Sequence, residues 1–443
     1  MFPFTSLFFA TFLLFWSATL VVGKDAIPPR ITPGIPGGHW VATWTSMPQL
    51  TESANLPPPP FNQSGSVFVN STIRQTIHAS IGGSQLRVRI SNAFGVNDLP
   101  ITGATIALPV NNTAGVSGIQ TNTLQTLTFS GNSSIIVPNG GLVVSDPLDF
   151  NVNSQAMVTI TLYLAQGQQS NLVTSHPGSR TTTWFSFGNH LTAQSLTDPS
   201  TQNVAHWYFL SAVDVWAPQS KNALAIVGDS ITDGRGSDTD RNNRWPDLVL
   251  AKMQKTPATL NIAVVNQAAG GNRILNDGLG PNALGRIDRD VLAQSGIKYA
   301  MIFEGVNDIG TASTSVADQQ VVGDRVIQAF KQIAARVHAF QIPIFAATIT
   351  PFSAPNSTIQ PYSDPNREAT RQRVNTFIRT SGIFDAVVDF DAILKDPKIP
   401  SQLNPNFNSG DFLHPNVAGY QAVADAFPLS IFSQFKDGVD GFN

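Results

Sequence analysis

The fold of this chain is decided by the stretch Ala223-Leu224-Ala225-Ile226-Val227-Gly228-Asp229-Ser230-Ile231-Thr232-Asp233-Gly234. Its first five residues are all apolar, which is typical of a strand buried on both faces of a parallel sheet. The apolar run stops at a Gly-Asp-Ser turn, so the hydroxyl of Ser230 lies at the carboxyl end of the strand. Chemistry in open α/β sheets takes place at these strand ends, and a serine on a tight turn into a helix is a candidate nucleophile. The plainer interpretation is that Asp229 or Ser230 caps the helix that follows.

Strands and helices alternate along residues 222–443. The expected strands are 223–228, 260–266, 298–304, 342–350 and 385–390, and the expected helices are about 244–255, 282–294, 318–340, 364–380 and one from about 416. The pattern is clearest in the longest helix, where apolar residues recur at three-and-four spacing. Such alternation builds a parallel sheet with helices on both faces, so residues 222–443 are predicted to form a three-layer α/β/α domain.

Residues 40–217 are predicted to form an all-β domain. Residues 72–81 alternate apolar and polar side chains, Gly82-Gly83 interrupts them, and 86–90 alternate again, which predicts a hairpin with one buried face. Further strands are expected near 101–108, 127–129, 135–137, 142–144, 157–164, 181–187 and 208–215. Short strands at this spacing, without helical periodicity, favour a sandwich or a jelly roll.

The amino-terminal segment predicts secretion. An almost continuous apolar run from Leu7 to Val22 is typical of a signal peptide over residues 1–23, and a Pro/Gly-rich lead follows over 24–39. No Lys or Arg precedes the run, so an uncleaved membrane anchor is the alternative, although no stable anchor is expected. Candidate N-glycosylation sequons fit passage through the secretory pathway. They begin at Asn62, Asn70, Asn111, Asn132 and Asn356.

The composition excludes several classes of function. The net charge is −3 and only 12% of the residues are charged, with no basic clusters, which argues against nucleic acid as a partner. The chain has no cysteine, so disulfides, thiolate metal sites and cysteine nucleophiles are ruled out. No acidic residue near the candidate site has metal-ligand spacing to a histidine, and no metal is expected.

A serine nucleophile needs a base, and only two of the seven histidines follow Ser230. His338 lies late in the expected 318–340 helix, where a surface or helix-end role is far more common than catalysis. His414 lies in a loop just before the last helix, with Asp411 three residues upstream. That spacing lets Asp411 accept the Nδ1 proton while Nε2 faces a serine, so His414 is the candidate base and Asp411 its partner.

Acyl transfer also needs hydrogen-bond donors for the negative oxygen that develops on the carbonyl group. Two loops at the carboxyl ends of expected strands supply them. One loop contains Gly271, and the other is Gly305-Val306-Asn307-Asp308. The backbone N–H groups of Ser230 and Gly271 and the side-chain amide of Asn307 therefore form a candidate oxyanion hole.

These blocks occur in the order and spacing of a known family. Gly228-Asp229-Ser230-Ile231, the Gly271 loop, Gly305-x-Asn307-Asp308 and Asp411-x-x-His414 together resemble the SGNH/GDSL hydrolases. The resemblance covers residues 222 to about 430, and the β-rich half resembles the amino-terminal extension of a secreted microbial subgroup. It implies a flavodoxin-like sheet, no cofactor, and ester hydrolysis through an acyl-enzyme.

Residue by residue, the resemblance implies Ser230 as the nucleophile, His414 as the base and Asp411 as the partner of the base. It also implies Gly271 and Asn307 as oxyanion donors.

Two further residues near the candidate site are candidates for substrate binding, Asp229 and Arg273. The guanidinium of Arg273 can bind a substrate hydroxyl or carboxylate, but a salt bridge with a nearby acid is its plainer role.

The expected function is that of a secreted serine esterase acting on O-acyl esters. Short acyl groups such as acetyl on carbohydrate fit the secreted context and the β domain. A lipase or acylhydrolase for longer acyl esters or lipids is the alternative, which would need an apolar groove that the sequence does not reveal. An alternative from another class is a non-catalytic carbohydrate-binding protein. Its stacking residues would be tryptophans, although aromatic side chains more often fill cores and interfaces. The tryptophans in question are Trp40, Trp44, Trp184, Trp207 and Trp216.

Overall fold

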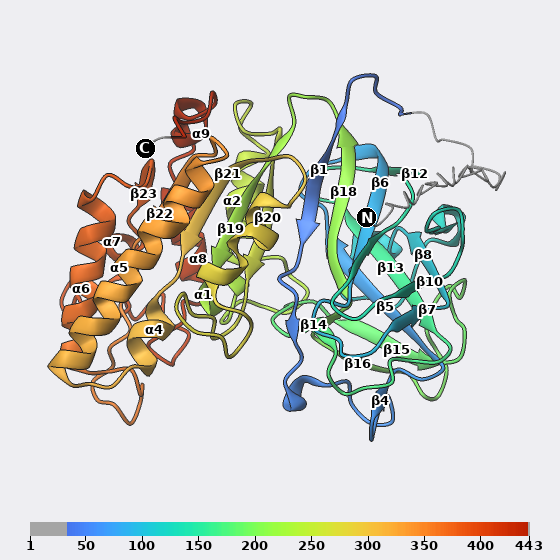
Figure 1. Ribbon diagram of the computed structural model, residues 1–443, viewed down its shortest axis with the longest axis horizontal. Helices are drawn as coiled ribbons and strands as arrows, with labels where there is room; N and C mark the ends of the chain where they lie inside the picture. Colours follow the sequence, from blue (N-terminus) through green and yellow to red (C-terminus); the bar gives the residue numbers. More distant parts are fainter. Residues whose placement is uncertain (1–32, 442–443) are drawn as a thin grey trace, which may run out of the picture. The chain divides into compact units, whose positions relative to one another are not determined.

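Two kinds of sheet make up the computed structural model, which describes residues 33–441 (Figure 1). Antiparallel sheets occupy residues 39–217, the β region, and a parallel sheet with helices occupies residues 222–441, the α/β region. All the described residues belong to one compact unit, so the division into separate domains stays a prediction. The predicted signal peptide over 1–23, and residues 24–32 of the lead, lie outside the described residues. Within the described range, no helix is long and apolar enough to cross a membrane.

The β region consists of short strands, a short helix η1 (Ser53–Asn55) and two further 3₁₀ turns. The strands are β1 (His39–Thr45), β2 (Gln49–Leu50), β3 (Asn62–Gln63), β4 (Ser66–Val67), β5 (Ser71–His78), β6 (Gly83–Ser91), β7 (Leu99–Ile101), β8 (Gly103–Ala107), β9 (Gln125–Thr126), β10 (Ile135–Val137), β11 (Leu142–Val144), β12 (Leu148–Val152), β13 (Met157–Leu164), β14 (Thr174–His176), β15 (Thr183–Phe187), β16 (Gln202–Val204), β17 (Trp207–Tyr208) and β18 (Leu210–Ala217). The six-stranded sheet has the order β16-β15-β5-β13-β8-β9, and a five-stranded sheet has the order β1-β18-β6-β11 with β12 also on β6. Apolar side chains of both sheets, such as Ile77 and Val88, share one core, as the sandwich prediction requires.

The predicted hairpin between residues 72–81 and 86–90 is wrong. Strands β5 and β6 exist, but β5 pairs with β13 and β15 in one sheet, whereas β6 pairs with β18, β11 and β12 in the other. The Gly82-Gly83 pair lies where the chain passes between the sheets. A Cβ atom on Gly82 would lie 2.3 Å from the carbonyl oxygen of Val152, so this glycine is needed for a close backbone approach and does not form a hairpin turn.

Strand β5 is also buried on both faces, not on one. Its polar residues are covered by loops of the β region that satisfy them. Arg74, for example, donates hydrogen bonds to the carbonyl oxygens of Ser117 (2.7 Å) and His190 (3.0 Å). Alternation of polar and apolar residues therefore did not mark a solvent-facing side, because the polar side chains are buried and hydrogen-bonded.

The α/β region has a five-stranded parallel sheet in the order β20-β19-β21-β22-β23. Its strands are β19 (Asn222–Gly228), β20 (Ile262–Ala268), β21 (Ile297–Phe303), β22 (Ile344–Ala347) and β23 (Ala386–Val388). Its helices are α1 (Ser230–Asp233), α2 (Trp245–Met253), α3 (Ala283–Ile287), α4 (Val306–Thr311), α5 (Val316–His338), α6 (Pro365–Thr380), α7 (Phe390–Leu394), α8 (Val417–Ala426) and α9 (Ser430–Gln434). In chain order the strand sequence is 2-1-3-4-5, the flavodoxin-like arrangement that the resemblance implied.

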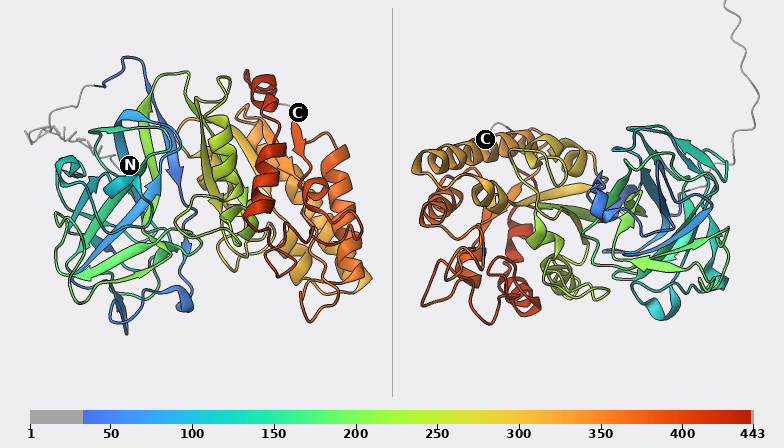
Figure 2. Two further views of the ribbon diagram at one scale, coloured as in Figure 1. Left: turned by 180° about the vertical axis from the view of Figure 1, so that it is seen from behind. Right: turned by 90° about the horizontal axis from the view of Figure 1, so that it is seen from below.

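Alternate residues of β19 face two different cores. Ala225 and Val227 lie in the core that includes residues of α3, α5 and α6, whereas Leu224 and Ile226 lie in the core that includes residues of α2, α7 and α8. Helices thus cover both faces of the sheet, as Figure 2 shows, and the three-layer α/β/α prediction is confirmed. The order of the strands reverses between β19 and β21, so the crevice at their carboxyl ends is the expected ligand position.

The β region packs against the edge strand of the parallel sheet. Strand β1 lies beside β20 (Figure 1), and the Thr45 hydroxyl donates to the carbonyl oxygen of Asn266 at 3.1 Å. The hydroxyl of Ser80 donates to the carbonyl oxygen of Val264 at 2.7 Å. The β region therefore covers an edge that would otherwise expose unpaired backbone groups.

Candidate active site

Ser230 is the first residue of α1, directly after strand β19 and its turn. The carboxylate of Asp229 caps this helix, because its Oδ1 accepts a hydrogen bond from the N–H of Ile231 at 2.9 Å. The two interpretations of the stretch are thus compatible, since Asp229 provides the cap and the Ser230 hydroxyl lines a pocket. The backbone N–H of Ser230 lies at the start of the helix, where no carbonyl one turn earlier is available to accept it.

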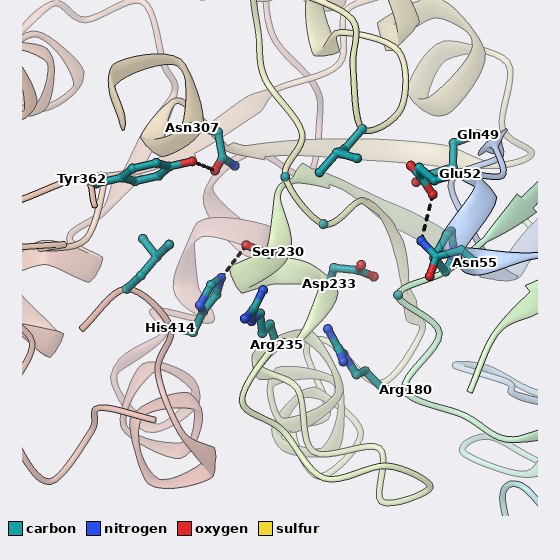
Figure 3. Close-up of a pocket in the computed structure, with 16 residues that line it drawn as sticks. Gln49, Glu52, Asn55, Arg180, Ser230, Asp233, Arg235, Asn307, Tyr362 and His414 are labelled. Carbon is teal, nitrogen blue, oxygen red and sulfur yellow. Dashed lines mark hydrogen bonds between the residues drawn. The ribbon is translucent and has the colours of Figure 1, made fainter. Parts of the chain in front are cut away.

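Ser230, His414 and Asp411 form a chain of hydrogen bonds. Ser230 Oγ lies 2.7 Å from His414 Nε2, and His414 Nδ1 lies 2.6 Å from Asp411 Oδ2 (Figure 3 shows the first contact). Asp411 Oδ1 also accepts the backbone N–H groups of Leu413 (3.0 Å) and His414 (2.9 Å), which fixes the loop before α8. Because the carboxylate accepts the Nδ1 proton, Nε2 is left to accept the serine proton.

The pKa values of this pair follow from burial and hydrogen bonding. Burial acts to raise the pKa of Asp411, but its hydrogen bonds with His414 outweigh burial and hold the pKa well below its ordinary value. Burial lowers the pKa of His414, and the positive charges of Arg235 and Arg180 act in the same direction, against the opposing effect of Asp411. His414 is therefore neutral, the form that can accept a proton, at neutral pH and somewhat below it.

Gly271 and Asn307 line the same pocket as Ser230. Gly271 has φ +72°, and a Cβ atom there would lie 2.3 Å from Leu279 Cδ1, so both its backbone conformation and its surroundings favour glycine. Asn307 was expected in a loop, but it lies in the first turn of helix α4, which begins after Gly305. The six-residue helix was missed because one and a half turns are too short to show a helical periodicity.

The amide of Asn307 is held from both ends by residues that the sequence did not single out. Its Oδ1 accepts the Tyr362 hydroxyl at 3.1 Å (Figure 3), and its Nδ2 donates to the carbonyl oxygen of Asn272 at 2.9 Å. An Nδ2 group has two hydrogens, so one remains to point into the pocket. Gln360, two residues before Tyr362, connects this segment to the loop that contains His414, because its Nε2 donates to the carbonyl oxygen of Asp411 at 2.8 Å.

The pocket has a volume of about 460 Å³, and the β region forms a large part of its wall. The lining residues from the β region are Gln49, Glu52, Asn55, Pro177, Gly178 and Arg180. Figure 3 shows Arg180 and the Glu52-Asn55 pair on the side of the pocket away from Tyr362. No motif in the sequence indicated these residues, because they come from loops, the two-residue strand β2 and the three-residue helix η1, none of which is long enough to show periodicity.

Asp229 and Arg273, the candidate substrate-binding residues, are not among the residues that line this pocket. Asp229 is buried behind the Ser230 turn, and Arg273 donates to the carbonyl oxygen of Asp277 at 2.5 Å. The described residues form no ion pair with Arg273, so the expected salt bridge is absent from this part of the chain. His338 ends helix α5, where its Nε2 contacts Asp385 at 2.9 Å, in keeping with a helix-end role.

Three acids lie buried behind the strand ends. Burial, together with the charges of Asp308 and Asp233, raises the pKa of Asp229 to about 7. Burial raises the pKa of Asp308 to about 6, although it accepts the N–H groups of Ile274 (2.8 Å) and Leu275 (3.0 Å).

The third buried acid is Glu304. Burial and the neighbouring Asp229 raise its pKa well above the ordinary value, against the effect of Arg286 at 3.5 Å. From residue 33 to residue 441, no group of histidines and acids is arranged to hold a metal ion.

The tryptophans proposed as stacking residues mainly pack against other protein groups. Trp44 and Trp207 are buried and meet edge to face with ring centroids 4.8 Å apart. Trp40 and Trp216 pack in the same way at 5.2 Å, and Trp184 donates its indole N–H to the carbonyl oxygen of Gly115. None of these rings lines the pocket.

The fold and the candidate site together define a class, an ester-hydrolysing enzyme whose candidate reactive groups lie at the carboxyl ends of a parallel sheet. The comparison with protein families is more specific. Residues 224–427 match the family model described as GDSL-like Lipase/Acylhydrolase, so this part of the chain is a GDSL-like lipase/acylhydrolase domain. No curated protein sequence matches the chain.

Three of the solved structures that match the chain cover 47% to 49% of it. A GDSL-like lipase from Bacteroides thetaiotaomicron is 16% identical, with 49% of this chain and 90% of that chain covered and a TM-score of 0.34. A catalytic mutant of an acetylxylan esterase from Geobacillus stearothermophilus is 23% identical, with 47% and 94% covered and a TM-score of 0.36. A carbohydrate acetylesterase family member from Sinorhizobium meliloti is 12% identical, with 48% and 98% covered and a TM-score of 0.35.

Proposed function

We propose that this protein is a secreted serine esterase that removes short acyl groups, such as acetyl, from hydroxyl-rich molecules. The observation that carries the proposal is the hydrogen-bonded chain from Ser230 through His414 to Asp411 at a pocket. A serine hydroxyl with a neutral imidazole at 2.7 Å, itself oriented by a carboxylate, is the arrangement that activates a serine nucleophile.

In the proposed reaction, Ser230 Oγ attacks the ester carbonyl carbon while His414 Nε2 takes the hydroxyl proton. The carbonyl oxygen becomes negative and accepts the N–H groups of Ser230 and Gly271 and the free Nδ2 hydrogen of Asn307; each such donor is worth about 10²–10³ in rate. His414 returns the proton to the leaving alcohol oxygen, which leaves an acyl group on Ser230. Water then attacks the acyl-enzyme, with His414 taking and returning a proton in the same way, and releases the acid.

The chemistry of the pocket wall supports a short acyl group. Only four lining side chains offer much apolar surface: Pro177, Leu279, Tyr362 and Leu413. The others are charged or polar, or are glycines. Each buried methylene of an acyl chain gains about 0.8 kcal/mol only where apolar surface receives it. A long acyl chain would therefore lie against polar groups. An acylhydrolase for longer acyl esters is the second candidate function, and its support is that the matching family model is described as covering lipases and acylhydrolases.

Secretion is part of the proposal and rests on the sequence. Asn70, Asn111, Asn132 and Asn356, the first residues of four candidate sequons, are exposed, and Asn62 is half-buried, so these positions are open to a glycan. The apolar run over residues 7–22 supplies the expected signal.

A panel of esters tests the activity and the acyl length together. It contains p-nitrophenyl esters from acetyl to palmitoyl, with acetylated xylan and pectin, and is run on the full chain beside Ser230→Ala. We expect hydrolysis to fall with chain length, and Ser230→Ala to lower kcat by about 10⁴-fold or more.

The matched control for this experiment is Ser433→Ala, which removes an exposed hydroxyl on α9 and should leave activity unchanged. Undiminished hydrolysis by Ser230→Ala would refute the catalytic assignment. Activity that rises toward the long-chain esters would overturn the short-acyl assignment alone.

A further inference from the structure

Two arginines face the pocket without a close carboxylate partner (Figure 3). Among the described residues, the guanidinium of Arg180 makes no ion pair and no hydrogen bond, and its Nε is buried. The nearest carboxylate to Arg235 is Asp411 at 4.0 Å, and the Arg235 side chain is 63% exposed. A guanidinium group has five N–H donors and stays charged. A guanidinium without a partner beside the candidate nucleophile is therefore suited to bind an anion.

The two acids that line the same pocket, Glu52 and Asp233, form hydrogen bonds with other residues and no ion pair with these arginines. Both carboxylate oxygens of Glu52 accept side-chain amides, from Gln49 at 2.7 Å and from Asn55 at 3.0 Å.

The other pocket acid, Asp233, contacts His176 Nε2 at 2.8 Å through Oδ1. The Nδ1 of His176 faces the carbonyl oxygen of Met47 at 3.0 Å, so Nδ1 must carry a hydrogen. A proton must then also lie between Nε2 and Asp233, which makes the His176-Asp233 pair neutral as a whole. Glu52 keeps its negative charge, so with two arginines against one carboxylate the wall has a net positive charge.

The backbone at Arg180 is held in an unusual conformation that places this side chain. Arg180 has φ +49°, a left-handed backbone conformation that bulky residues rarely adopt. Its neighbours fix it there. The Arg180 carbonyl oxygen accepts the N–H of Asp240 at 2.9 Å, and the Asp240 carboxylate accepts both the N–H and the hydroxyl of Thr182 at 2.7 Å. Strain maintained by a surrounding network is typical of functional positions.

We propose that Arg180, assisted by Arg235, binds a carboxylate on the alcohol half of the substrate. The substrate class is then an O-acylated sugar acid or hydroxy acid. This inference rests on the proposed esterase function and adds the identity of the leaving group.

The position of the arginines relative to the base assigns the anion to the alcohol half. The leaving oxygen must lie within hydrogen-bond reach of His414 Nε2 to receive its proton. In Figure 3, Arg235 lies beside His414, and both arginines lie across Ser230 from the candidate oxyanion donor Asn307. The charge available also favours a carboxylate over a phosphate monoester, because Asp411 already balances part of the charge of Arg235.

The test compares two acetyl esters that differ only in the charged group. They are O-acetylated methyl glucuronoside and O-acetylated methyl glucoside, and acetate release is measured with the full chain. We expect kcat/KM to be about tenfold or more higher on the acid, as is usual when a charged group gains a hydrogen bond to its counterion. Arg180→Gln should lower kcat/KM on the acid by about 10–100-fold, a clearly larger loss than on the neutral ester.

Companion variants separate charge from shape. Arg180→Lys keeps the charge but loses the planar fork, so it should fall between wild type and Arg180→Gln. Arg325→Gln removes the same charge from the exposed face of α5 and should preserve the preference for the acid. Thermal unfolding establishes whether Arg180→Gln is folded, and if it is not, the exposed variant Arg235→Gln is expected to lower the preference several-fold.

The acid side of the pH profile gives an independent readout. Arg180 and Arg235 both act to lower the pKa of His414, whereas Asp411 acts to raise it. Removing the positive charge of Arg180 should therefore raise the pKa of His414, so the fall of kcat/KM at acid pH moves to higher pH in Arg180→Gln. If Arg180 acted only through the shape of the pocket, the acid side of the pH profile would not move in Arg180→Gln.

Several outcomes would overturn the inference while leaving the esterase proposal intact. They are equal rates of the wild type on the two esters, or an equal loss on both in Arg180→Gln. A stronger preference for the acetylated glucoside 6-phosphate than for the glucuronoside would replace the carboxylate by a phosphate. Absence of any Ser230-dependent hydrolysis would instead refute the proposed function itself.

Discussion

Single hydrogen bonds decide which way the groups of this site point. The amide of Asn307 can donate into the pocket only if its oxygen faces away, and the Tyr362 hydroxyl at 3.1 Å binds that oxygen. A phenol hydroxyl that donates to an amide oxygen leaves the amide nitrogen on the other side, where Asn272 takes one of its two hydrogens. Tyr362 is therefore a positioning residue for the candidate oxyanion hole.

Replacing Tyr362 by Phe should lower kcat by about 3–30-fold with little change in KM. The expected loss is below that for a missing oxyanion donor, because the donor stays and only its orientation is relaxed. Steady-state kinetics on a short-chain ester measure the two constants. Tyr163→Phe is a matched control, since Tyr163 is also half-buried and donates to an asparagine oxygen, that of Asn70 at 2.9 Å, far from the pocket. Equal kinetics of the two variants would contradict the positioning role.

The residues that could be predicted from the sequence are those that local spacing or a strand end marks. Ser230 ends an apolar run, and Asp411 and His414 are close neighbours along the chain. Tyr362 and Arg180 could not be found in this way, because they reach the site through tertiary contacts. Tyr362 and Asn307, for example, are 55 positions apart.

At the scale of elements, the carboxyl ends of the parallel strands hold both the candidate catalytic groups and several buried carboxyl groups, whose charged forms are unfavourable there. Asp229 joins β19 to α1, Asp308 lies in the first turn of α4, and Glu304 follows β21. All three carboxyl groups are buried, and burial raises the pKa of each. Between about pH 4 and pH 6 the folded protein therefore keeps protons on these groups that the unfolded chain has released.

The Asp229 carboxyl makes the free energy of unfolding depend on pH in a defined direction. Its pKa is about 7 in the folded protein and about 3.9 in an unfolded chain. The protonated carboxyl therefore contributes its full amount to the free energy of unfolding below about pH 4, and this contribution is lost as the pH rises through 7. Asp229→Asn cannot ionise and keeps an oxygen that can cap α1. We expect the decline in stability between about pH 5 and pH 8 to be shallower in this variant.

Urea unfolding at several pH values measures this slope. Asp425→Asn, at an exposed position on α8, is the control and should keep the slope of the wild type. An unchanged slope in Asp229→Asn would mean that the carboxyl is already ionised in the folded protein.

The elements themselves were predictable to different degrees. The five parallel strands occur close to their expected positions, because buried apolar runs between helices have few other interpretations. The pairing of β5 with β6 was predicted wrongly, because alternation indicates a strand but not its partner. Pairing in the β region depends on contacts between strands distant in sequence, such as β5 with β13 and β15.

At the scale of the whole molecule, the β region and the α/β region share one apolar core. Val41 of β1 and Ile160 of β13 belong to the same cluster of buried side chains as Val265 of β20 and Ile333 of α5. The β region also supplies Glu52 and Arg180 to the pocket wall. The β region therefore contributes to the common core and, in the proposed function, also contacts the substrate.

A shared core predicts that the two regions unfold together. Among the described tryptophans only Trp245 lies in the α/β region, so tryptophan fluorescence mainly follows the β region, whereas ester hydrolysis follows the α/β region. We expect both signals, and the heat absorbed in calorimetry, to change in one transition. Ile160→Ala in the β region and Ile333→Ala in the α/β region each remove a buried side chain at a cost of about 2–5 kcal/mol. If the regions are one cooperative unit, either variant lowers the midpoint of both signals together. A variant that moves only the signal of its own region would show that the regions are independently stable and that their contact along β1 and β20 contributes little to folding.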